Sequence, residues 1–128
     1  MDSFTPLERT ALNAIFAAAG ERGPILERQL LSAKVASREN TGGGFFANLQ
    51  VDPDAEPLDL KISSLGKNIW LGIEGLEYGL GAILHCKGGR ANLLEGYAVG
   101  PEDTSPIDFV HVRFAIIPEP GPLPSYGN

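Results

Sequence analysis

The sequence has a single cysteine and no long apolar run. One cysteine, Cys86, excludes an internal disulfide bond. A membrane-spanning helix needs about 20 consecutive apolar residues, and no stretch of the chain comes close, so we expect a soluble protein with no membrane contact. The first residues lack the basic and apolar regions of a secretory signal, which favours a cytoplasmic location.

Positive charge is also scarce. The chain has 10 Lys and Arg against 16 Asp and Glu, which gives a formal net charge of −6 and a pI near 4.8. An excess of carboxylates repels phosphate backbones, so nucleic acid is not an expected partner. The same charge would speed encounter with a basic protein.

Turn-forming residues are abundant instead. The chain has 16 glycines and 10 prolines in 128 residues, against averages of roughly 7% and 5%, and this composition favours a fold with many turns over a helical bundle. Residues 1–117 are expected to form a single α+β domain. Residues 118–128 carry a proline at positions 118, 120, 122 and 124, which predicts an extended or disordered tail.

The N-terminal segment predicts helices. Thr5 can cap a helix that begins at Pro6, Glu8 is the matching capping-box residue, and Gly20 can end the helix. A second, shorter helix is expected from Gly23 to Leu31.

The rest of the chain predicts strands, because apolar and polar residues alternate with a period of two. The expected strands cover 32–38, 45–51, 58–62, 69–73, 80–87, the residues after 90, and 108–117. We therefore predict an α+β fold in which an N-terminal helix or helix pair packs on a mostly antiparallel, twisted sheet of about five to seven strands.

Residues 69–99 are the centre of this prediction. Gly88 and Gly89 suit a two-residue type I′ turn, so Lys87 should face Arg90 across a tight hairpin. With that register, one face of the hairpin would contain the pairs Cys86–Ala91, Leu84–Leu93, Ala82–Glu95 and Leu80–Tyr97.

This register makes Glu95 the most conspicuous residue, because it puts a carboxylate on an otherwise apolar face. An ionised carboxylate there must be paired or must raise its pKa. By residue type, Arg38 and Arg113 are the expected partners. Glu95 is then either a structural carboxylate that holds a loop or an arginine, or a functional acid or binding group.

Two other features bear on a site. Gly42 to Gly44 are not followed by the Lys and Ser or Thr of a phosphate-binding loop, so they indicate a sharp bend or a close approach of backbones. His85 and Cys86 are adjacent in a predicted strand and point to opposite faces, which argues against a joint metal site.

Three segments together resemble a family of small uncharacterised bacterial proteins. They are RENTGGGFF (38–46), GLEYGLG (75–81) and LEGY (94–97), which match the patterns RExTGxGFF, GLxxGxG and LEGY and together span about half of the chain. The resemblance implies a bacterial source and an α+β fold. It brings no assigned activity or catalytic residue.

Two functional classes follow from these observations. The first is a non-enzymatic protein-binding module, immunity-type or regulatory, that binds a basic partner or forms a homodimer through its sheet. The alternative is a small ligand-binding protein or enzyme that uses Glu95 beside a glycine-lined cleft. No catalytic residue, metal or cofactor is assigned; the candidate binding residues are Arg38, Gly43, Gly44, Trp70, Glu95 and Tyr97.

Overall fold

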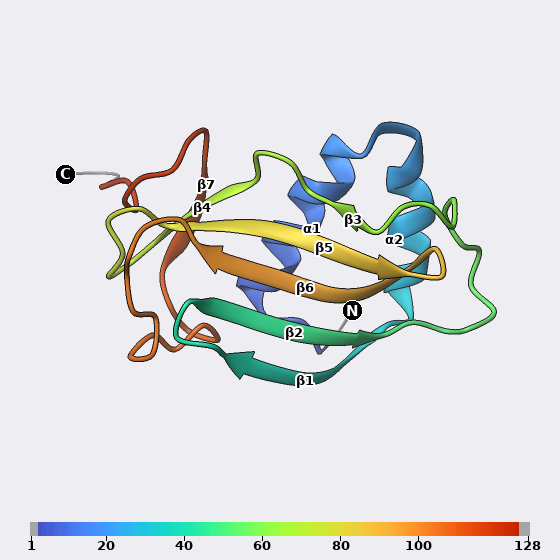
Figure 1. Ribbon diagram of the computed structural model, residues 1–128, viewed down its shortest axis with the longest axis horizontal. Coiled ribbons are helices and arrows are strands. Elements are labelled where there is room, and N and C mark those ends of the chain that lie inside the picture. The colour runs from blue at the N-terminus through green and yellow to red at the C-terminus, as the bar shows by residue number, and fades with distance from the viewer. Residues whose placement is uncertain (1–2, 126–128) are drawn as a thin grey trace.

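The computed structural model describes residues 3–125 and has the expected α+β fold (Figure 1). The helices are α1 (Pro6–Ala18) and α2 (Gly23–Leu31), joined by the 3-10 turn η1 (Gly20–Arg22). The strands are β1 (Lys34–Asn40), β2 (Gly44–Gln50), β3 (Ser64–Leu65), β4 (Trp70–Ile73), β5 (Leu80–Lys87), β6 (Arg90–Ala98) and β7 (Phe114–Ile117). None of the helices in this part of the chain is long and apolar enough to cross a membrane.

The predicted start of α1 is confirmed. The Thr5 hydroxyl accepts a hydrogen bond from Glu8 N at 3.1 Å, and Glu8 Oε1 accepts one from Thr5 N at 2.9 Å, which completes a capping box. The helix ends where Gly20 adopts a φ of +60°. Leu7, Leu12 and Ile15 are fully buried and hold α1 against the sheet.

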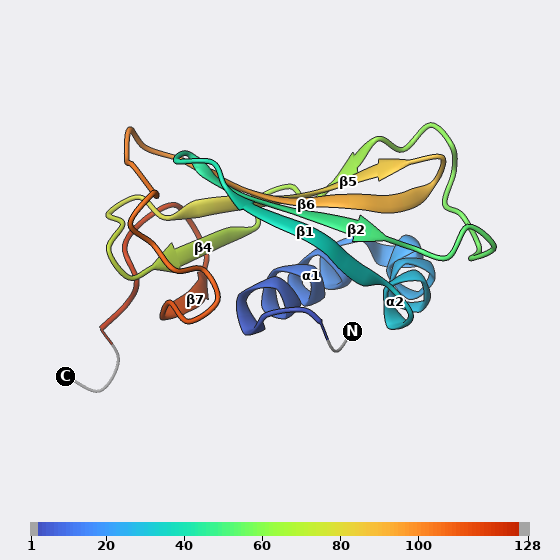
Figure 2. The ribbon, with the colours of Figure 1, turned by 90° about the horizontal axis from the view of Figure 1, so that it is seen from below.

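The seven strands form one antiparallel sheet in the order β1-β2-β6-β5-β4-β7, with β3 added beside β5. Both helices lie on the same side of this sheet (Figure 2). On the other side, the strands β2, β6, β5 and β4 have no helix of the described chain over them. We call this side the open face.

The β5–β6 hairpin begins as predicted but then changes register. Gly88 and Gly89 have φ values of +60° and +77°, and Lys87 faces Arg90. After Cys86–Ala91, however, His85 faces Leu93, so Asn92 is the extra residue of a β-bulge.

The predicted pairs beyond the bulge are therefore wrong. Leu84 faces Leu94, Ala82 faces Gly96 and Ile83 faces Glu95. A shift of one residue moves every later side chain of β6 to the other face of the sheet. Leu94 turns toward the helices and is fully buried, whereas Glu95 lies on the open face.

Gln29 on α2 fixes the end of this hairpin. Its buried amide donates from Nε2 to Gly89 O at 3.0 Å and to Glu56 O at 2.9 Å, and its Oε1 accepts from Ala91 N at 3.0 Å. One side chain thus satisfies backbone groups of the turn, of β6 and of the preceding loop.

One predicted strand is absent and another is shorter than expected, for the same physical reason. Residues 58–62 form a turn in which the Asp59 carboxylate accepts from Lys61 N at 2.9 Å. Residues 108–112 form another turn, in which the Asp108 carboxylate accepts from Val110 N at 3.0 Å, so only β7 remains of the strand expected over 108–117. Aspartate side chains compete with the sheet for backbone N–H groups in this way.

The proline-bearing segment packs on the domain over its described part. Residues 118–125 form no helix or strand, and Gly121 N donates to Tyr78 O at 3.1 Å. A Cβ on Gly72 of β4 would lie 2.9 Å from Leu123 Cα, so the segment runs close over β4. Residues 126–128 of the predicted tail lie outside the described residues, and the division of the chain at residue 117 stays a prediction.

Candidate binding face

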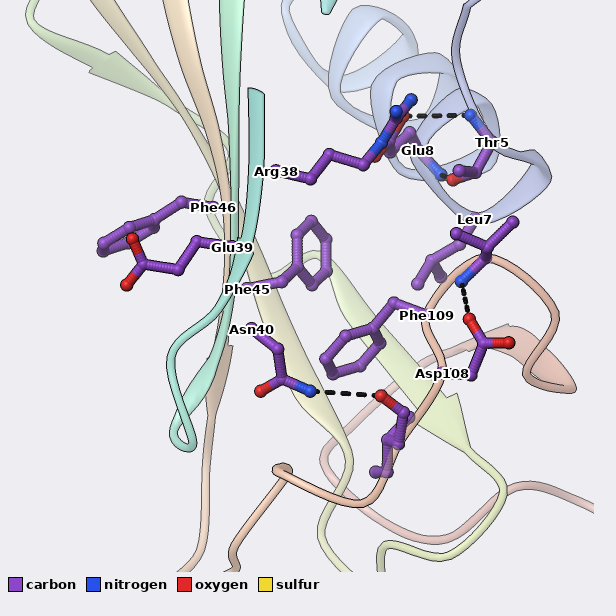
Figure 3. A pocket seen from close by; sticks show the side chains of 12 residues that line it. Thr5, Leu7, Glu8, Arg38, Glu39, Asn40, Phe45, Phe46, Asp108 and Phe109 are labelled. Atoms are coloured by element: carbon purple, nitrogen blue, oxygen red, sulfur yellow. Dashed lines mark hydrogen bonds and ion pairs between the residues drawn. The ribbon is translucent and has the colours of Figure 1, made fainter. Parts of the chain in front are cut away.

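The register of the central strands places apolar side chains on the open face, with the carboxylate of Glu95 among them. Glu95 lies between Phe46 on β2 and Ile83 on β5, and Tyr97 lies between Gly44 and Gly81. Trp70 on β4 faces Gly81 from the other side. Phe46, Trp70 and Tyr97, which we call the aromatic patch, are all partly exposed. Figure 3 shows Phe46 pointing away from the buried Phe45 across the sheet.

The Tyr97 ring occupies the space over Gly81 that a side chain would otherwise fill. A Cβ on Gly81 would lie 2.1 Å from Tyr97 Cζ, so the tyrosine ring lies directly over that glycine. The ring also meets Trp70 edge-on, with ring centroids 6.5 Å apart. On the helix side of the sheet, the Phe45 ring covers Gly96 in the same manner.

Glu95 is paired, but not with the residues that the sequence suggested. Its Oε1 lies 2.8 Å from His85 Nε2, and the two side chains are 28% and 35% exposed. Arg113 pairs with Glu74 at 3.2 Å instead. The predicted arginine partners are wrong because the bulge at Asn92 moves Glu95 to the open face, next to His85 on β5.

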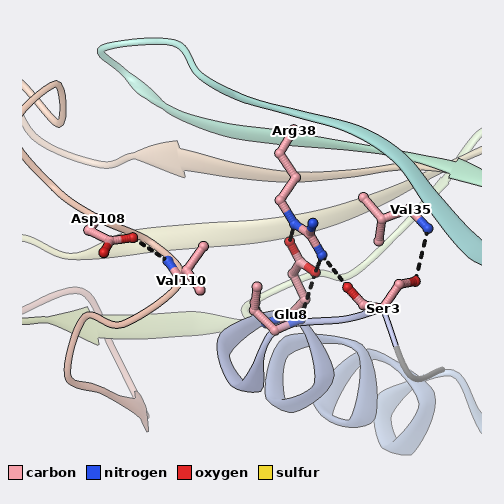
Figure 4. Close-up of polar contacts among 7 residues, drawn as sticks. Ser3, Glu8, Val35, Arg38, Asp108 and Val110 are labelled. Atoms are coloured by element: carbon pink, nitrogen blue, oxygen red, sulfur yellow. Dashed lines mark hydrogen bonds and ion pairs between the residues drawn. The ribbon is translucent and has the colours of Figure 1, made fainter.

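Arg38 lies on the helix side of the sheet, far from this arrangement. Its Nε and Nη2 bond the two carboxylate oxygens of Glu8 at 2.8 and 2.9 Å (Figure 4). Nη2 also donates to Ser3 O. The Glu8 hydrogen bond raises the pKa of Arg38 above its usual value. The structure therefore separates Arg38 from Glu95.

Gly43 and Gly44 form the end of the β1–β2 hairpin and serve backbone packing. Gly44 has a φ of +134°, and a Cβ there would lie 1.9 Å from Gly96 O. Gly43 O accepts from Ala98 N at 2.8 Å. Gly44 lies beside Tyr97 in register, so these glycines border the aromatic patch.

A buried threonine that the sequence analysis missed ties the loop after β6 to these glycines. Thr104 is fully buried, and its hydroxyl donates to Asn40 Oδ1 at 2.9 Å and accepts from Gly44 N at 3.0 Å. Asn40 Nδ2 donates back to Thr104 O at 2.8 Å. Nothing in the local pattern around Thr104 indicates this role, because its partners Gly44 and Asn40 lie 60 and 64 residues away in the chain.

Acidic residues lie at the end of the sheet that carries Tyr97, which we call the aromatic end. Glu39 faces Phe46 across the β1–β2 pair, and the loops at the Tyr97 end of the sheet carry Glu77, Glu102 and Asp103. The Glu102 carboxylate accepts from Glu77 N and Tyr78 N, which fixes it in place. Hydrogen bonds from Ser105 lower the pKa of Asp103 and so favour its charged form.

The opposite end of the sheet carries charges of both signs. Lys34 is the first residue of β1, and Lys87 and Arg90 flank the turn between β5 and β6. The acidic loop after β2, with Asp52, lies beside them.

Metal ligands do not gather in the described residues. Residues 3–125 contain no group of three or more His, Cys, Asp and Glu side chains placed to hold an ion. His85 points to the open face, while Cys86 faces the buried Ala91. Burial raises the pKa of the Cys86 thiol, which disfavours the reactive thiolate.

Comparisons of the chain with protein-family models, curated proteins and solved structures give no significant match. The resemblance to small bacterial proteins stays a prediction, and the functional argument rests on the geometry.

Proposed function

We propose that the protein is a non-enzymatic binding module, immunity-type or regulatory, that uses its aromatic patch to bind a net-basic protein. The observation that carries the proposal is the open face itself. Phe46, Trp70 and Tyr97 are partly exposed and lie on the open face, which no helix of the described chain covers (Figure 2). Large aromatic side chains supply much of the binding energy in protein interfaces. The sequence-based expectations of a bacterial source and a cytoplasmic location belong to this proposal.

The negative charge of the protein favours a basic partner. The chain carries a net charge of −6, and Glu39, Glu77, Glu102 and Asp103 lie at the aromatic end of the sheet. Complementary charge raises association rates and suppresses wrong partners. A basic protein fits this end better than nucleic acid or an acidic protein does.

Glu95 gives the patch a specific polar contact. Only one of its carboxylate oxygens, Oε1, has a hydrogen-bond partner among the described residues. The other oxygen can accept a hydrogen bond from an arginine or lysine of the partner, and such charge-assisted bonds are the stronger ones.

The shape around Glu95 favours a macromolecular partner over a small ligand. The spaces over Gly81 and Gly96 are filled by the rings of Tyr97 and Phe45, so these glycines do not line an empty cleft. Glu95 is left on a broad sheet surface, which suits a protein interface.

Native mass spectrometry of the untagged protein, isolated gently from its own cells at low salt, tests the proposal. We expect a second, net-basic polypeptide at fixed stoichiometry. It should dissociate as salt rises from about 0.1 to about 1 M, because the Debye length falls from about 10 to about 3 Å. Tyr97→Ser should lose the partner, whereas the control Leu60→Ser, which changes an exposed apolar residue outside the strands, should keep it.

Three outcomes would contradict the proposal. One is a bare chain under all conditions, and another is a homodimer with no second polypeptide. The third is a partner that Tyr97→Ser retains as well as the wild type does, since the aromatic patch would then not be the binding surface.

A further inference from the structure

A second candidate site lies on the helix side of the sheet. A cavity of about 220 Å³ opens between the start of α1, the β1–β2 pair and the 107–110 turn (Figure 3). Both Phe45 and Phe46 border it, but the Phe45 ring points into it whereas the Phe46 ring points to the other side of the sheet, toward the aromatic patch (Figure 3).

Apolar side chains form most of the cavity wall. Phe45 and Phe109 lie with ring centroids 5.1 Å apart and ring planes tilted by 50°. Leu7 lines the cavity from α1, and Ile107 and Val110 line it from the turn. Val110 is 46% exposed and lies at the rim.

Most polar side chains around the cavity already have hydrogen-bond partners in the protein; Glu39 borders it as an exposed residue of β1. Glu8 uses both carboxylate oxygens for Arg38 and Thr5. Asn40 donates to Thr104 O and Ile107 O. The Asp108 carboxylate accepts from Val110 N and from His111 Nδ1. No buried side-chain nitrogen or oxygen within residues 3–125 lacks a hydrogen-bond partner.

This pairing limits what the cavity can recognise. A ligand with many polar groups would lose water without gaining partners, which is unfavourable. An anion is disfavoured further, because Glu8 compensates the charge of Arg38 and Asp108 adds a second carboxylate.

The size of the cavity limits the ligand to one or two rings. A cavity of about 150 Å³ lined by Leu, Ile and Phe side chains can hold benzene, whereas pockets for drug-sized ligands measure roughly 300 Å³ or more. The volume of about 220 Å³ lies between these values.

We propose that this cavity is a binding site for an uncharged, flat, hydrocarbon-rich molecule of one or two rings. The site is independent of the proposed partner surface. A bound ring would contact α1, β2 and the 107–110 turn together, so it would stabilise the packing of that turn on the domain.

The test is a titration with indole as the probe, followed by heteronuclear NMR. We expect saturable shifts centred on Leu7, Phe45, Phe109 and Val110, with a dissociation constant on the order of 0.1 to 1 mM. Benzoate, which is flat but anionic, should bind at least about tenfold more weakly.

Val110→Phe is the matched variant, because it adds a ring at the rim of the cavity. It should weaken indole binding by about tenfold or more. Val99→Phe makes the same change at a comparably exposed residue that does not line the cavity, and it should bind indole like the wild type.

Non-saturable or scattered shifts in the wild type would overturn the proposal even if Val110→Phe failed to fold. Equal binding of benzoate and indole would also overturn it. Tyr97→Ser should bind indole like the wild type. Failure of the partner proposal and failure of the indole proposal can therefore be told apart.

Discussion

Glu8 shows how one side chain can serve both a helix start and a distant strand. Its carboxylate closes the capping box with Thr5 and accepts two hydrogen bonds from Arg38 on β1. The capping box was predictable, because its members are three residues apart and local spacing defines it. The Arg38 contact was not predictable, because it joins residues 30 positions apart and depends on where β1 packs.

Replacing Glu8 with Ala should therefore lower the free energy of unfolding by more than the loss of an ordinary helix cap does. Loss of a cap typically costs about 1 kcal/mol, and the change also leaves Arg38, which is 39% exposed, without its partner. We expect the free energy of unfolding to fall by about 2 to 3 kcal/mol; this value already allows for solvent screening of the partly exposed Arg38. Urea unfolding monitored by circular dichroism measures the change.

Glu21→Ala is the control, because Glu21 is an exposed glutamate in the η1 turn that follows α1. It should stay within about 0.5 kcal/mol of the wild type. A similar effect for both variants would show that the Glu8 contacts contribute little.

At the scale of elements, the helices and most strands could be predicted from the sequence. The periods of α1 and β2 and the Gly88–Gly89 turn are local signals, and the structure confirms them. The β-bulge at Asn92 is not local. Leu93 and Leu94 are adjacent and both apolar, so either could face the core. In the structure Leu94 is the one buried in the core, and Gln29 on α2 holds Ala91 in the matching position.

That single bulge decides where the candidate site lies. The regular register predicted Glu95 on the helix side, beside an arginine. The observed register places it on the open face beside His85, next to Phe46 and Ile83 in the ladder. In the observed register Tyr97 meets Trp70 on the open face and Glu95 lies on the same face, whereas Arg38 lies on the helix side and pairs with Glu8.

The β1–β2 hairpin provides a second test at this scale. Gly44→Ala should destabilise the protein by about 3 kcal/mol, because Gly44 has a φ of +134° and a Cβ would meet Gly96 O at 1.9 Å. Gly43→Ala adds the same methyl group one residue away, where no atom lies within 4 Å. It should change the free energy of unfolding by less than about 0.5 kcal/mol.

Thermal unfolding of the two hairpin variants, followed by calorimetry, checks this difference. Equal stabilities would mean that β2 and β6 do not approach as closely at Gly44 as the structure shows.

At the scale of the whole molecule, the two faces of the sheet have different roles. The side under α1 and α2 holds the buried core, with Leu84 and Leu94 among its fully buried members. The open face holds the aromatic patch, with Glu39 beside Phe46 and acidic loops at the Tyr97 end of the sheet. Composition alone indicated the acidic balance, but only the strand order and register show that Glu39, Glu77, Glu102 and Asp103 lie at the same end of the sheet as the aromatic patch.

Trp70 allows the central claim to be measured directly. It is the only tryptophan in the chain and belongs to the aromatic patch, so a protein labelled with 5-fluorotryptophan gives one fluorine NMR signal from the open face. The measurement is a titration of that protein with the purified net-basic partner. The account predicts that the signal shifts and saturates at a fixed stoichiometry. A signal that stays unchanged while the partner binds would contradict it, because the partner would then occupy another surface.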